Sequence, residues 1–342
     1  MTMASMAKAG TAMERLIRIG LSALPWLIIG SLLWAGLFVK PQPVGASVQP
    51  PVLERRDNFY GIAAGREGQL LVAGTGGKIL RIDPASGRVS RDRTPVGETL
   101  QDIAGWNGER AVAVGNDGAI LISADGGPAW ERVADVPRSE VANKLTRVKT
   151  AAGGVAVASG EMGALLVSRD FGATWARLRE EEDLAWNDVA LVDASRMVVV
   201  GEFGRILVSE DGGTAWTEPA SPVPSSLMAV AFRDAKNGVA VGLEGVVLAT
   251  HDGGRTWRQA ELGIHEHLFD VAWDAAGGRW IGAGALGRWI TADAAAERWQ
   301  SGRLDERDLS WHTRVLPLNG QVWFAGANVG RWDGQAWTPL AD

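Results

Sequence analysis

The chain has 342 residues, of which 46% are hydrophobic and 22% are charged, and this composition excludes a wholly disordered protein. It contains no cysteine, which excludes disulfides, thiolate catalysis and cysteine-ligated zinc. The net charge is −6, but residues 1–50 carry +3 and the remainder carries −9. Such an acidic body argues against nucleic acid as a partner.

The first predicted element is a membrane anchor at residues 19–39. This run of 21 residues has no charge, and as a helix it is long enough for a hydrocarbon core of about 30 Å. Lys8, Arg15 and Arg18 precede it, so residues 1–18 are expected to stay in the cytoplasm. The sequence therefore predicts a single-pass inner-membrane protein whose body is periplasmic.

A cleaved signal peptide is the alternative, and it would make the protein secreted. Val44-Gly45-Ala46 could serve as the cleavage site, but the apolar region of a signal peptide is usually only 7–15 residues long. The uncleaved anchor is the favoured interpretation. Residues 40–57 are rich in proline and predict a semi-rigid linker.

The remainder of the chain, residues 58–342, repeats one unit seven times. Turn glycines recur every 41 to 45 residues, at Gly77, Gly118, Gly163, Gly204, Gly245, Gly287 and Gly330. A second landmark lies sixteen or seventeen residues before each of them and is always followed by Ile or Val, at Gly61, Asp102, Arg147, Asp188, Ala229, Asp270 and Arg314. Such a period is the signature of a repeat architecture.

Within each unit the pattern is that of β-structure. Short β-branched runs alternate with Gly or Asp turns, and no apolar stripe is long enough for a helix. About 41 residues hold four short strands, which is the size of a propeller blade. The fold class is therefore an all-β, seven-bladed β-propeller preceded by one transmembrane helix. Because the seventh copy is short, residues near Pro51–Arg55 are candidates for a strand that closes the ring.

A third recurring motif follows the pattern S/T-x-D-x-G-x-T-W and matches the Asp box, or BNR repeat. Its aspartate can accept hydrogen bonds from turn amides, and its tryptophan can pack into the blade. One carboxylate per turn is too few for calcium, and His265 and His267 lack an evident third ligand, so no metal site is predicted. The predicted structural residues are Asp125, Trp130, Asp170, Trp175, Asp211, Trp216, Asp252 and Trp257.

Together with the G-x-x-G turns and the D-V type of first strand, these boxes resemble the photosystem II stability/assembly factor-like branch of the BNR propellers. The resemblance covers roughly residues 58–339. It implies a scaffold that holds a membrane-protein subunit while its complex matures. For a non-photosynthetic host it implies instead an accessory role at a membrane exporter. Neither role involves a cofactor.

The alternative function is a glycan-binding protein or a sialidase-like glycoside hydrolase, since sialidases also carry BNR repeats. By resemblance such an enzyme needs three arginines, a tyrosine paired with a glutamate, and an aspartic acid. The only tyrosine is Tyr60, in the first unit, whereas a sialidase has its nucleophile late in the chain and only six blades. The sequence therefore favours a protein that is not an enzyme.

Partner binding is predicted on one face of the propeller. In a four-stranded blade the turns between the second and third strands share a face with the blade-to-blade connectors, opposite the Asp boxes. Apolar residues beside carboxylates at turn tips suit protein recognition, although ordinary variable loops remain an alternative. The candidates for contact with a membrane protein or membrane protein complex are Asn116, Asp117, Glu161, Met162, Glu202, Phe203, Leu243, Glu244 and Leu286.

The central channel is the second candidate site. Five charged landmark residues occupy equivalent first-strand positions and are expected to approach the axis together: Asp102, Arg147, Asp188, Asp270 and Arg314. Three carboxylates and two guanidinium groups favour a structural ion network. A small polar ligand in the channel mouth is the alternative.

Overall fold

The N-terminal unit of the computed structural model, which describes residues 3–38 and 52–340, is one helix, α1 (Met3–Phe38). It begins at Met3 rather than at Ile19, because residues 3–18 are rich in strong helix formers such as Ala, Met, Leu and Arg. Its segment Gly20–Phe38 is long and apolar enough to cross a membrane, as a signal sequence near the N-terminus also would be. Residues 40–51 of the predicted linker, with the alternative cleavage site at residues 44–46, lie outside the described residues.

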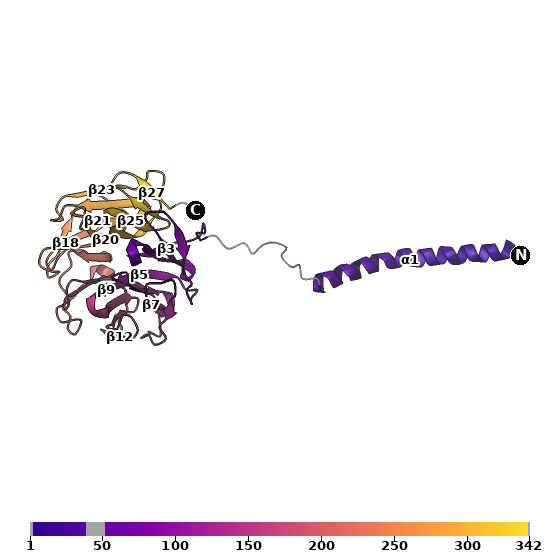
Figure 1. The fold of residues 1–342 in the computed structure, drawn as a ribbon, viewed down its shortest axis with the longest axis horizontal. Coiled ribbons are helices and arrows are strands. Elements are labelled where there is room, and N and C mark those ends of the chain that lie inside the picture. Colours follow the sequence, from indigo (N-terminus) through magenta and orange to yellow (C-terminus); the bar gives the residue numbers. More distant parts are fainter. Residues whose placement is uncertain (1–2, 39–51, 341–342) are drawn as a thin grey trace. The chain divides into compact units, whose positions relative to one another are not determined.

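The second unit, which starts at Val52, is a seven-bladed β-propeller, as predicted. Across residues 52–340 the strands form seven antiparallel sheets, each built from consecutive strands, and Figure 1 shows them arranged in a ring. In chain order the strands are β1 (Phe59–Ala64), β2 (Leu70–Gly74), β3 (Ile79–Ile82), β4 (Val89–Arg91), β5 (Leu100–Trp106), β6 (Arg110–Gly115), β7 (Ile120–Ser123), β8 (Glu131–Arg132), β9 (Leu145–Ala151), β10 (Val155–Gly160), β11 (Leu165–Ser168), β12 (Ala176–Arg177), β13 (Trp186–Leu191), β14 (Met197–Gly201), β15 (Ile206–Ser209), β16 (Leu227–Phe232), β17 (Gly238–Gly242), β18 (Val247–Thr250), β19 (Arg258–Ala260), β20 (Leu268–Asp274), β21 (Arg279–Gly284), β22 (Arg288–Ala292), β23 (Trp299–Arg303), β24 (His312–Leu318), β25 (Gln321–Gly326), β26 (Val329–Trp332) and β27 (Trp337–Pro339).

Short 3₁₀ turns join several of these strands. Two of them connect the first and second strands of a blade, and five connect the second and third strands. They are η1 (Arg66–Gly68), η2 (Thr75–Gly77), η3 (Asn116–Gly118), η4 (Ala152–Gly154), η5 (Glu202–Gly204), η6 (Leu243–Gly245) and η7 (Ala285–Gly287).

The fourth blade departs from the four-stranded pattern. Its sheet has three strands, and the fourth is reduced to one bridge between Val208 and Thr217, with both backbone hydrogen bonds formed at 2.8 and 2.9 Å. Pro219 follows two residues later and has no N–H to continue the ladder. The proline therefore explains why this outer strand ends early.

The innermost strand of every blade carries a β-bulge at the same place. The register shifts by one residue directly before the landmark residue, for example between Leu100 and Asp102 in β5. A bulge adds one unpaired residue to the strand and redirects its side chain. The seven bulge residues are Tyr60, Gln101, Thr146, Asn187, Met228, Phe269 and Thr313.

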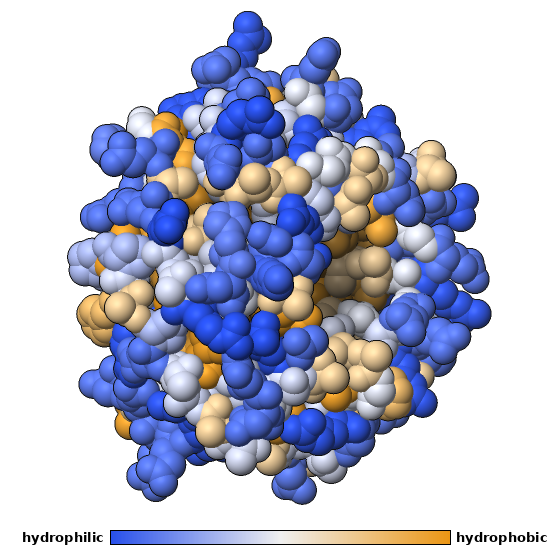
Figure 2. Space-filling model, turned by 90° about the vertical axis from the view of Figure 1, so that its left-hand side faces the viewer, coloured by the Kyte–Doolittle hydropathy of each residue, from blue (hydrophilic) through white to orange (hydrophobic). Residues whose placement is uncertain are grey.

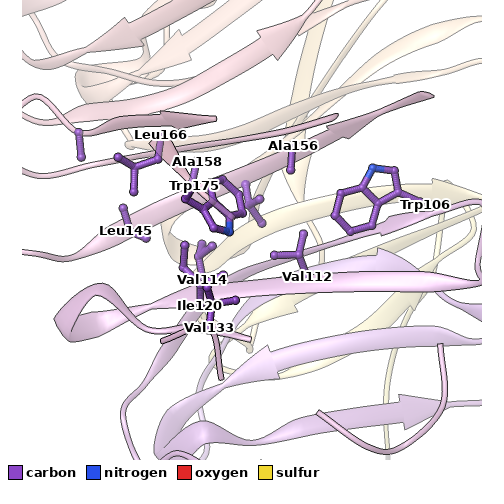
Figure 3. Packing of buried hydrophobic residues seen from close by; sticks show 12 residues of the cluster. Trp106, Val112, Val114, Ile120, Val133, Leu145, Ala156, Ala158, Leu166 and Trp175 are labelled. Atoms are coloured by element: carbon purple, nitrogen blue, oxygen red, sulfur yellow. The ribbon is translucent and has the colours of Figure 1, made fainter. Parts of the chain in front are cut away.

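The hydrophobic core lies between neighbouring blades. Figure 3 shows the cluster between the second and third blades, where Trp175 lies among Leu145, Val114 and Ala158. Each such cluster draws apolar side chains from the facing sheets of two blades, which buries both faces of each sheet.

Ring closure differs from the prediction. Residues 52–55 form no strand, Pro51 lies outside the described residues, and the seventh blade completes itself with β24 to β27. The first and last blades are joined instead by apolar packing that includes Phe59, Trp323 and Leu53. Asp57 is buried and pairs with Lys78, so residues 52–57 belong to the propeller rather than to a free linker. The short seventh copy still contains four strands because its turns are tighter.

Candidate functional site

The backbone hydrogen bonds define two faces of the propeller. On one face, which we call the connector face, turns between second and third strands bond to the blade-to-blade connectors: Gly118 N–H donates to the Asn143 carbonyl at 2.6 Å. On the other, the Asp-box face, the Asp boxes bond to turns between first and second strands: Gly253 N–H donates to the Lys236 carbonyl at 2.9 Å. The two faces therefore use different loops of each blade.

Three of the four predicted Asp boxes share one set of hydrogen bonds. In the fifth blade, Asp252 accepts from Thr256 N–H at 2.9 Å, from Thr256 Oγ1 at 2.7 Å and from Thr250 Oγ1 at 2.9 Å. Trp257 Nε1 donates to the Gly254 carbonyl at 2.9 Å while its ring is buried in the core. Asp170 with Trp175 repeats these contacts. Asp211 with Trp216 repeats them except for the threonine hydroxyl, because Ala215 stands at that position. The bonds are local to the turn, as expected for a structural role.

The box of the second blade is different. Asp125 accepts only from Gly127 N–H, and Trp130 Nε1 donates to Asp92 at 2.9 Å rather than to the turn. Pro128 follows the glycine and removes one of the amide donors that the motif normally supplies. Trp216 also departs from its relatives, because it is only partly buried whereas Trp257 is 6% exposed.

The connector-face candidates divide into two groups by their position in the turn. The first turn residue points inward: Asn116 accepts from Gln101 Nε2 at 2.9 Å, and Glu202 accepts from Ala185 N–H at 2.8 Å. Glu161 accepts from Lys144 N–H in the same way at 3.3 Å. These three candidates fasten the start of the first strand, and the sequence alone did not separate them from the rest.

The second turn residue points outward and has a left-handed backbone. The φ angle is 53° at Asp117, 53° at Met162, 58° at Phe203, 59° at Glu244 and 55° at Leu286. Residues with a Cβ adopt this region at a cost of roughly 1–2 kcal/mol. In the first blade Gly76 occupies this position. Leu243, a first-position candidate, is half-buried.

Exposed large apolar side chains are few on the propeller, and they share one face. Figure 2 shows one side of the molecule, where hydrophilic residues dominate and apolar residues form small separate groups beside a hollow. Within residues 52–340 the exposed large apolar side chains are Val52, Val141 (77%), Phe203 (69%), Leu286 (42%) and Leu309 (52%). Each lies in a turn between second and third strands, in a connector, or in the segment leading into β1, so all five occupy the connector face.

The five channel-layer residues lie together around the axis. Arg314 Nε donates to Asp102 at 3.0 Å, and Arg147 Nη2 donates to Asp270 at 2.9 Å, so both pairs join blades that are not neighbours. Arg147 Nε lies 3.6 Å from Asp188. The structure thus contains an ion network across the channel.

The aspartates of this layer also join neighbouring blades through the backbone. Asp102 accepts from Val148 N–H at 3.0 Å, Asp188 from Val230 N–H at 3.0 Å, and Asp270 from Val315 N–H at 2.8 Å. In each case the donor is the residue that follows the landmark of the next blade. The second, fourth and sixth blades are therefore linked to the third, fifth and seventh.

The two arginines of the channel layer have pKa shifts in opposite directions. Burial alone would lower the pKa of Arg147, but the charges of Asp188, Asp270 and Asp102 outweigh it and raise the pKa. The pKa of Arg314 is lowered, first by burial and then by the positive charge of Arg147. Burial opposes ionisation of Asp270, yet Arg147 and other cations bring its pKa below the ordinary value. The two guanidinium groups therefore repel each other despite the carboxylates between them.

The network divides the channel into two mouths. The mouth on the Asp-box face has a volume of ≈ 470 Å³, and its charged lining residues include Asp102 and Asp270 together with Lys149, Arg147 and Arg314. The mouth on the connector face has a volume of ≈ 140 Å³. It is lined by all seven of the redirected bulge residues and by three cations, and the full lining is Tyr60, Gln101, Lys144, Thr146, Arg147, Asn187, Met228, Phe269, Thr313 and Arg314.

The hydrolase alternative can be tested at this smaller mouth. Tyr60 does share the cavity with Arg147 and Arg314, but it stacks on Trp311 with ring centroids 5.6 Å apart. No carboxylate lines the cavity to act as acid or base, and ligand pockets for a sugar-sized molecule are usually ≈ 300 Å³ or more. The arrangement suits ion binding better than glycoside hydrolysis.

The sequence pattern did not identify the bulge residues or Lys144 as channel residues. The bulge residues could have been found, because each immediately precedes a landmark residue. Without a bulge, alternation along the strand would place that residue in a blade interface rather than in the channel. Only the observed register shift brings the seven side chains toward the axis.

The comparisons with known proteins agree with this architecture. A family model described as photosynthesis system II assembly factor YCF48 matches residues 85–220 and 175–265, which together span more than half of the chain. No curated protein matches the chain.

Three solved structures have the same fold. YCF48 from Cyanidioschyzon merolae is 16% identical, with a TM-score of 0.64, and the match covers 80% of this chain and 94% of that one. A structure titled YCF48 bound to D1 peptide is 17% identical, with a TM-score of 0.64, and covers 79% and 91%. Sqt1 from Saccharomyces cerevisiae is 11% identical, with a TM-score of 0.63, and covers 83% and 84%. With its seven blades, its Asp boxes and the family match over residues 85–265, the chain belongs to the YCF48 family of photosynthesis system II assembly factors.

Proposed function

We propose that this protein is a membrane-anchored, periplasmic scaffold that binds a membrane protein or a membrane protein complex through its connector face during assembly. In a non-photosynthetic host the partner would be a complex such as an exporter. The scaffold is not an enzyme in this proposal, and it needs no cofactor. The helix segment Gly20–Phe38 would be the anchor, with the preceding residues in the cytoplasm.

One observation carries the proposal: the exposed large apolar side chains of the propeller all lie on the connector face. Phe203 is 69% exposed and Leu286 is 42% exposed, and both stand at turn tips. Apolar side chains surrounded by polar residues are typical of protein-binding surfaces. The Asp-box face, in contrast, has its turn groups bonded to one another.

The strained backbone at these tips supports the same choice of face. Phe203 and Leu286 adopt φ angles of 58° and 55°, in a region where Gly is far more favourable. A bulky side chain in this conformation lowers stability, and such outliers concentrate at functional sites. Gly76 shows that the same turn forms without a side chain.

Relatives support a protein partner. One structural neighbour is titled as bound to a D1 peptide, and the matching family is described as assembly factors. The chain also enters the propeller on the connector face, through Val52–Asp57 and into β1. A tether at this end would therefore be attached on the face that we propose binds the partner.

The decisive experiment is affinity purification of the full-length protein from gently solubilised native membranes, with co-purifying proteins identified by mass spectrometry. The test variant is Phe203→Gly, and the matched control is Glu67→Gly, which also replaces a residue with a left-handed backbone but lies in a turn of the Asp-box face. We expect a stoichiometric membrane-protein partner with the parent and the control, and at least a tenfold loss with Phe203→Gly.

Both variants relieve a left-handed backbone, so neither is expected to unfold the protein. Retention of the partner by Phe203→Gly and by a Phe203→Gly/Leu286→Gly double variant would contradict the proposed face. Recovery of the parent protein without any partner from its native source would contradict the scaffold function itself.

A further inference from the structure

The connector-face mouth of the channel contains hydrogen-bond donors that have no acceptor in the described part of the chain. Thr313 Oγ1 is buried there and has no hydrogen-bond partner. The Lys144 ammonium group lines the same cavity and forms no ion pair with a described residue. Arg147, which is 2% exposed, also lines it and contacts Asp188, Asp270 and the Phe269 carbonyl through Nε and Nη2. Unpaired buried donors are uncommon and call for a ligand or water.

The charges around this mouth have one sign. Its charged lining residues are Lys144, Arg147 and Arg314, and no carboxylate lines it. Asp102 and Asp270 line the opposite mouth, which Arg147 and Arg314 also reach. Lys149, which lines that mouth too, lies 3.7 Å from Asp188. The low pKa of Arg314, caused by burial and by Arg147, agrees with a local excess of positive charge. A negative group in this mouth would relieve that repulsion.

The size and lining of the mouth limit what this group can be. A volume of ≈ 140 Å³ equals the liquid volume of about four or five water molecules. The polar side chains Gln101, Thr146 and Asn187 stand opposite the apolar ones of Met228 and Phe269. Such a cavity has room for a carboxylate with a short aliphatic stem, but not for a sugar or a nucleotide.

The geometry points to a carboxylate-binding site in the connector-face mouth, which rests on the proposed function in that the carboxylate belongs to the protein partner. The Lys144 ammonium group binds its oxygens with the support of the Arg147 positive charge, and Thr313 Oγ1 donates a further hydrogen bond. Charge-assisted hydrogen bonds of this kind are about twice as strong as neutral ones. An acidic side chain or a chain terminus of the partner supplies the group, while Phe203 and Leu286 contact its apolar residues nearby on the same face.

Propionate is the probe for a direct test, and the full-length protein in detergent micelles is the sample. The chain has six lysines, so reductive ¹³C-methylation gives few NMR signals while keeping every positive charge. We expect propionate at constant ionic strength to shift the Lys144 signal with saturation, while the Lys149 signal stays unchanged. Propionamide, the neutral isostere, should give no shift.

Two variants form the matched pair. Lys144→Met removes a cation from the connector-face mouth, and Lys149→Met removes one from the opposite mouth. The propionate-dependent rise in Tm should require about tenfold more propionate in Lys144→Met and should be unchanged in Lys149→Met. Both substitutions keep the length of the apolar stem, which limits their effect on packing.

Three results would overturn the site. They are an equal response to propionate and chloride, a response at Lys149 instead of Lys144, and inorganic phosphate binding more than tenfold tighter than propionate. The site and the proposed function can also fail separately. If Phe203→Gly loses the membrane partner while Lys144→Met retains it and shows no altered propionate response, the scaffold function stands and the carboxylate site is wrong.

Discussion

The two faces of this propeller are built from the same seven repeats, yet they use their polar groups in opposite ways. On the Asp-box face, Asp170, Asp211 and Asp252 each accept several hydrogen bonds from their own turn. On the connector face, Phe203 and Leu286 project apolar side chains into solvent from a left-handed backbone. The Asp-box carboxylates are hydrogen-bonded within their own turns, whereas the connector face leaves apolar side chains exposed to solvent.

This difference arises because each repeat carries the Asp-box motif in only one of its turns. The Asp box supplies donor, acceptor and tryptophan within eight residues, so each copy stabilises its own turn. The turns between second and third strands require only glycines and a hydrogen bond that a glycine N–H donates to the next connector. The residue between those glycines is free to vary in type, and it ranges from Gly76 to Phe203. This variable position is therefore the one at which a side chain specific for a partner can stand without a change in the turn.

The largest expected effect is on the Asp-box side, for Trp257→Ala. The ring is 6% exposed within the core of the fourth and fifth blades, so its removal should lower the free energy of unfolding by roughly 3–5 kcal/mol. Urea denaturation followed by circular dichroism measures this loss. Trp216→Ala is the control, and its loss should be smaller because that ring is only partly buried. Equal losses would mean that burial does not distinguish the boxes.

A smaller loss is expected for Asp252→Ala, which leaves the Thr256 N–H and two hydroxyl groups without their acceptor. We expect a decrease of about 1–3 kcal/mol in the free energy of unfolding, with the fold and the membrane partner retained. The partner capture described above provides the second measurement. Normal stability with loss of the partner would assign Asp252 to binding and remove the contrast between the faces.

The third prediction concerns acid stability and His312. This side chain is 1% exposed and stands where the other blades have a buried apolar residue, such as Leu100 or Leu268. Burial lowers its pKa below 6.5, although its hydrogen bond with Asn328 and the charge of Asp308 oppose this shift.

The unfolded chain binds the His312 proton more readily than the folded chain does. The contribution of His312 to the free energy of unfolding should therefore be constant above pH 6.5 and should decrease as the pH falls below 6.5, by at most about 1.4 kcal/mol per pH unit. Thermal unfolding between pH 8 and pH 5 measures the decline. His312→Leu should flatten the part of the curve between pH 6.5 and 5.5. An unchanged slope in that variant would assign the decline to other groups.

The smallest expected effect is a gain, for Leu286→Gly on the connector face. Glycine relieves the left-handed strain at this position but loses more chain entropy on folding, so the net gain should be about 0.5–1 kcal/mol. Chemical denaturation again gives the number, with Gly76→Leu as the reverse substitution in the first blade. A destabilised Leu286→Gly protein would show that Leu286 is held by packing rather than presented to a partner.

The repeat made much of the fold predictable. The spacing of the glycines predicted seven blades, and the motif predicted which aspartates accept turn amides. The repeat pattern did not indicate that Pro219 ends the last strand of the fourth blade early, or that the ring closes by apolar packing rather than by a strand from residues 51–55. Both depend on contacts between segments that carry no shared motif.

The pattern predicted that the candidate turns share a face with the connectors, as they do, but it did not predict the direction of each side chain. The pattern placed Glu202 and Phe203 together in one turn, yet the structure directs Glu202 inward to Ala185 N–H and Phe203 outward. Adjacent residues differ in this way because φ is positive at only one of them. The direction of each side chain therefore cannot be deduced from the identities of the turn residues alone.

For this protein, the sequence by itself determined the number of blades, the turns that hold them and the presence of one helix apolar enough for a membrane, because these depend on local periodicity and hydrophobicity. Only the tertiary structure decided how Asp102 and Arg314, 212 residues apart, meet across the channel. It also decided that the β-bulges bring one side chain from each blade to the axis, and that Arg147 and Lys144 share a cavity that no carboxylate side chain lines. Ring geometry sets these contacts, since the distance between two blades across the channel bears no relation to their separation along the chain.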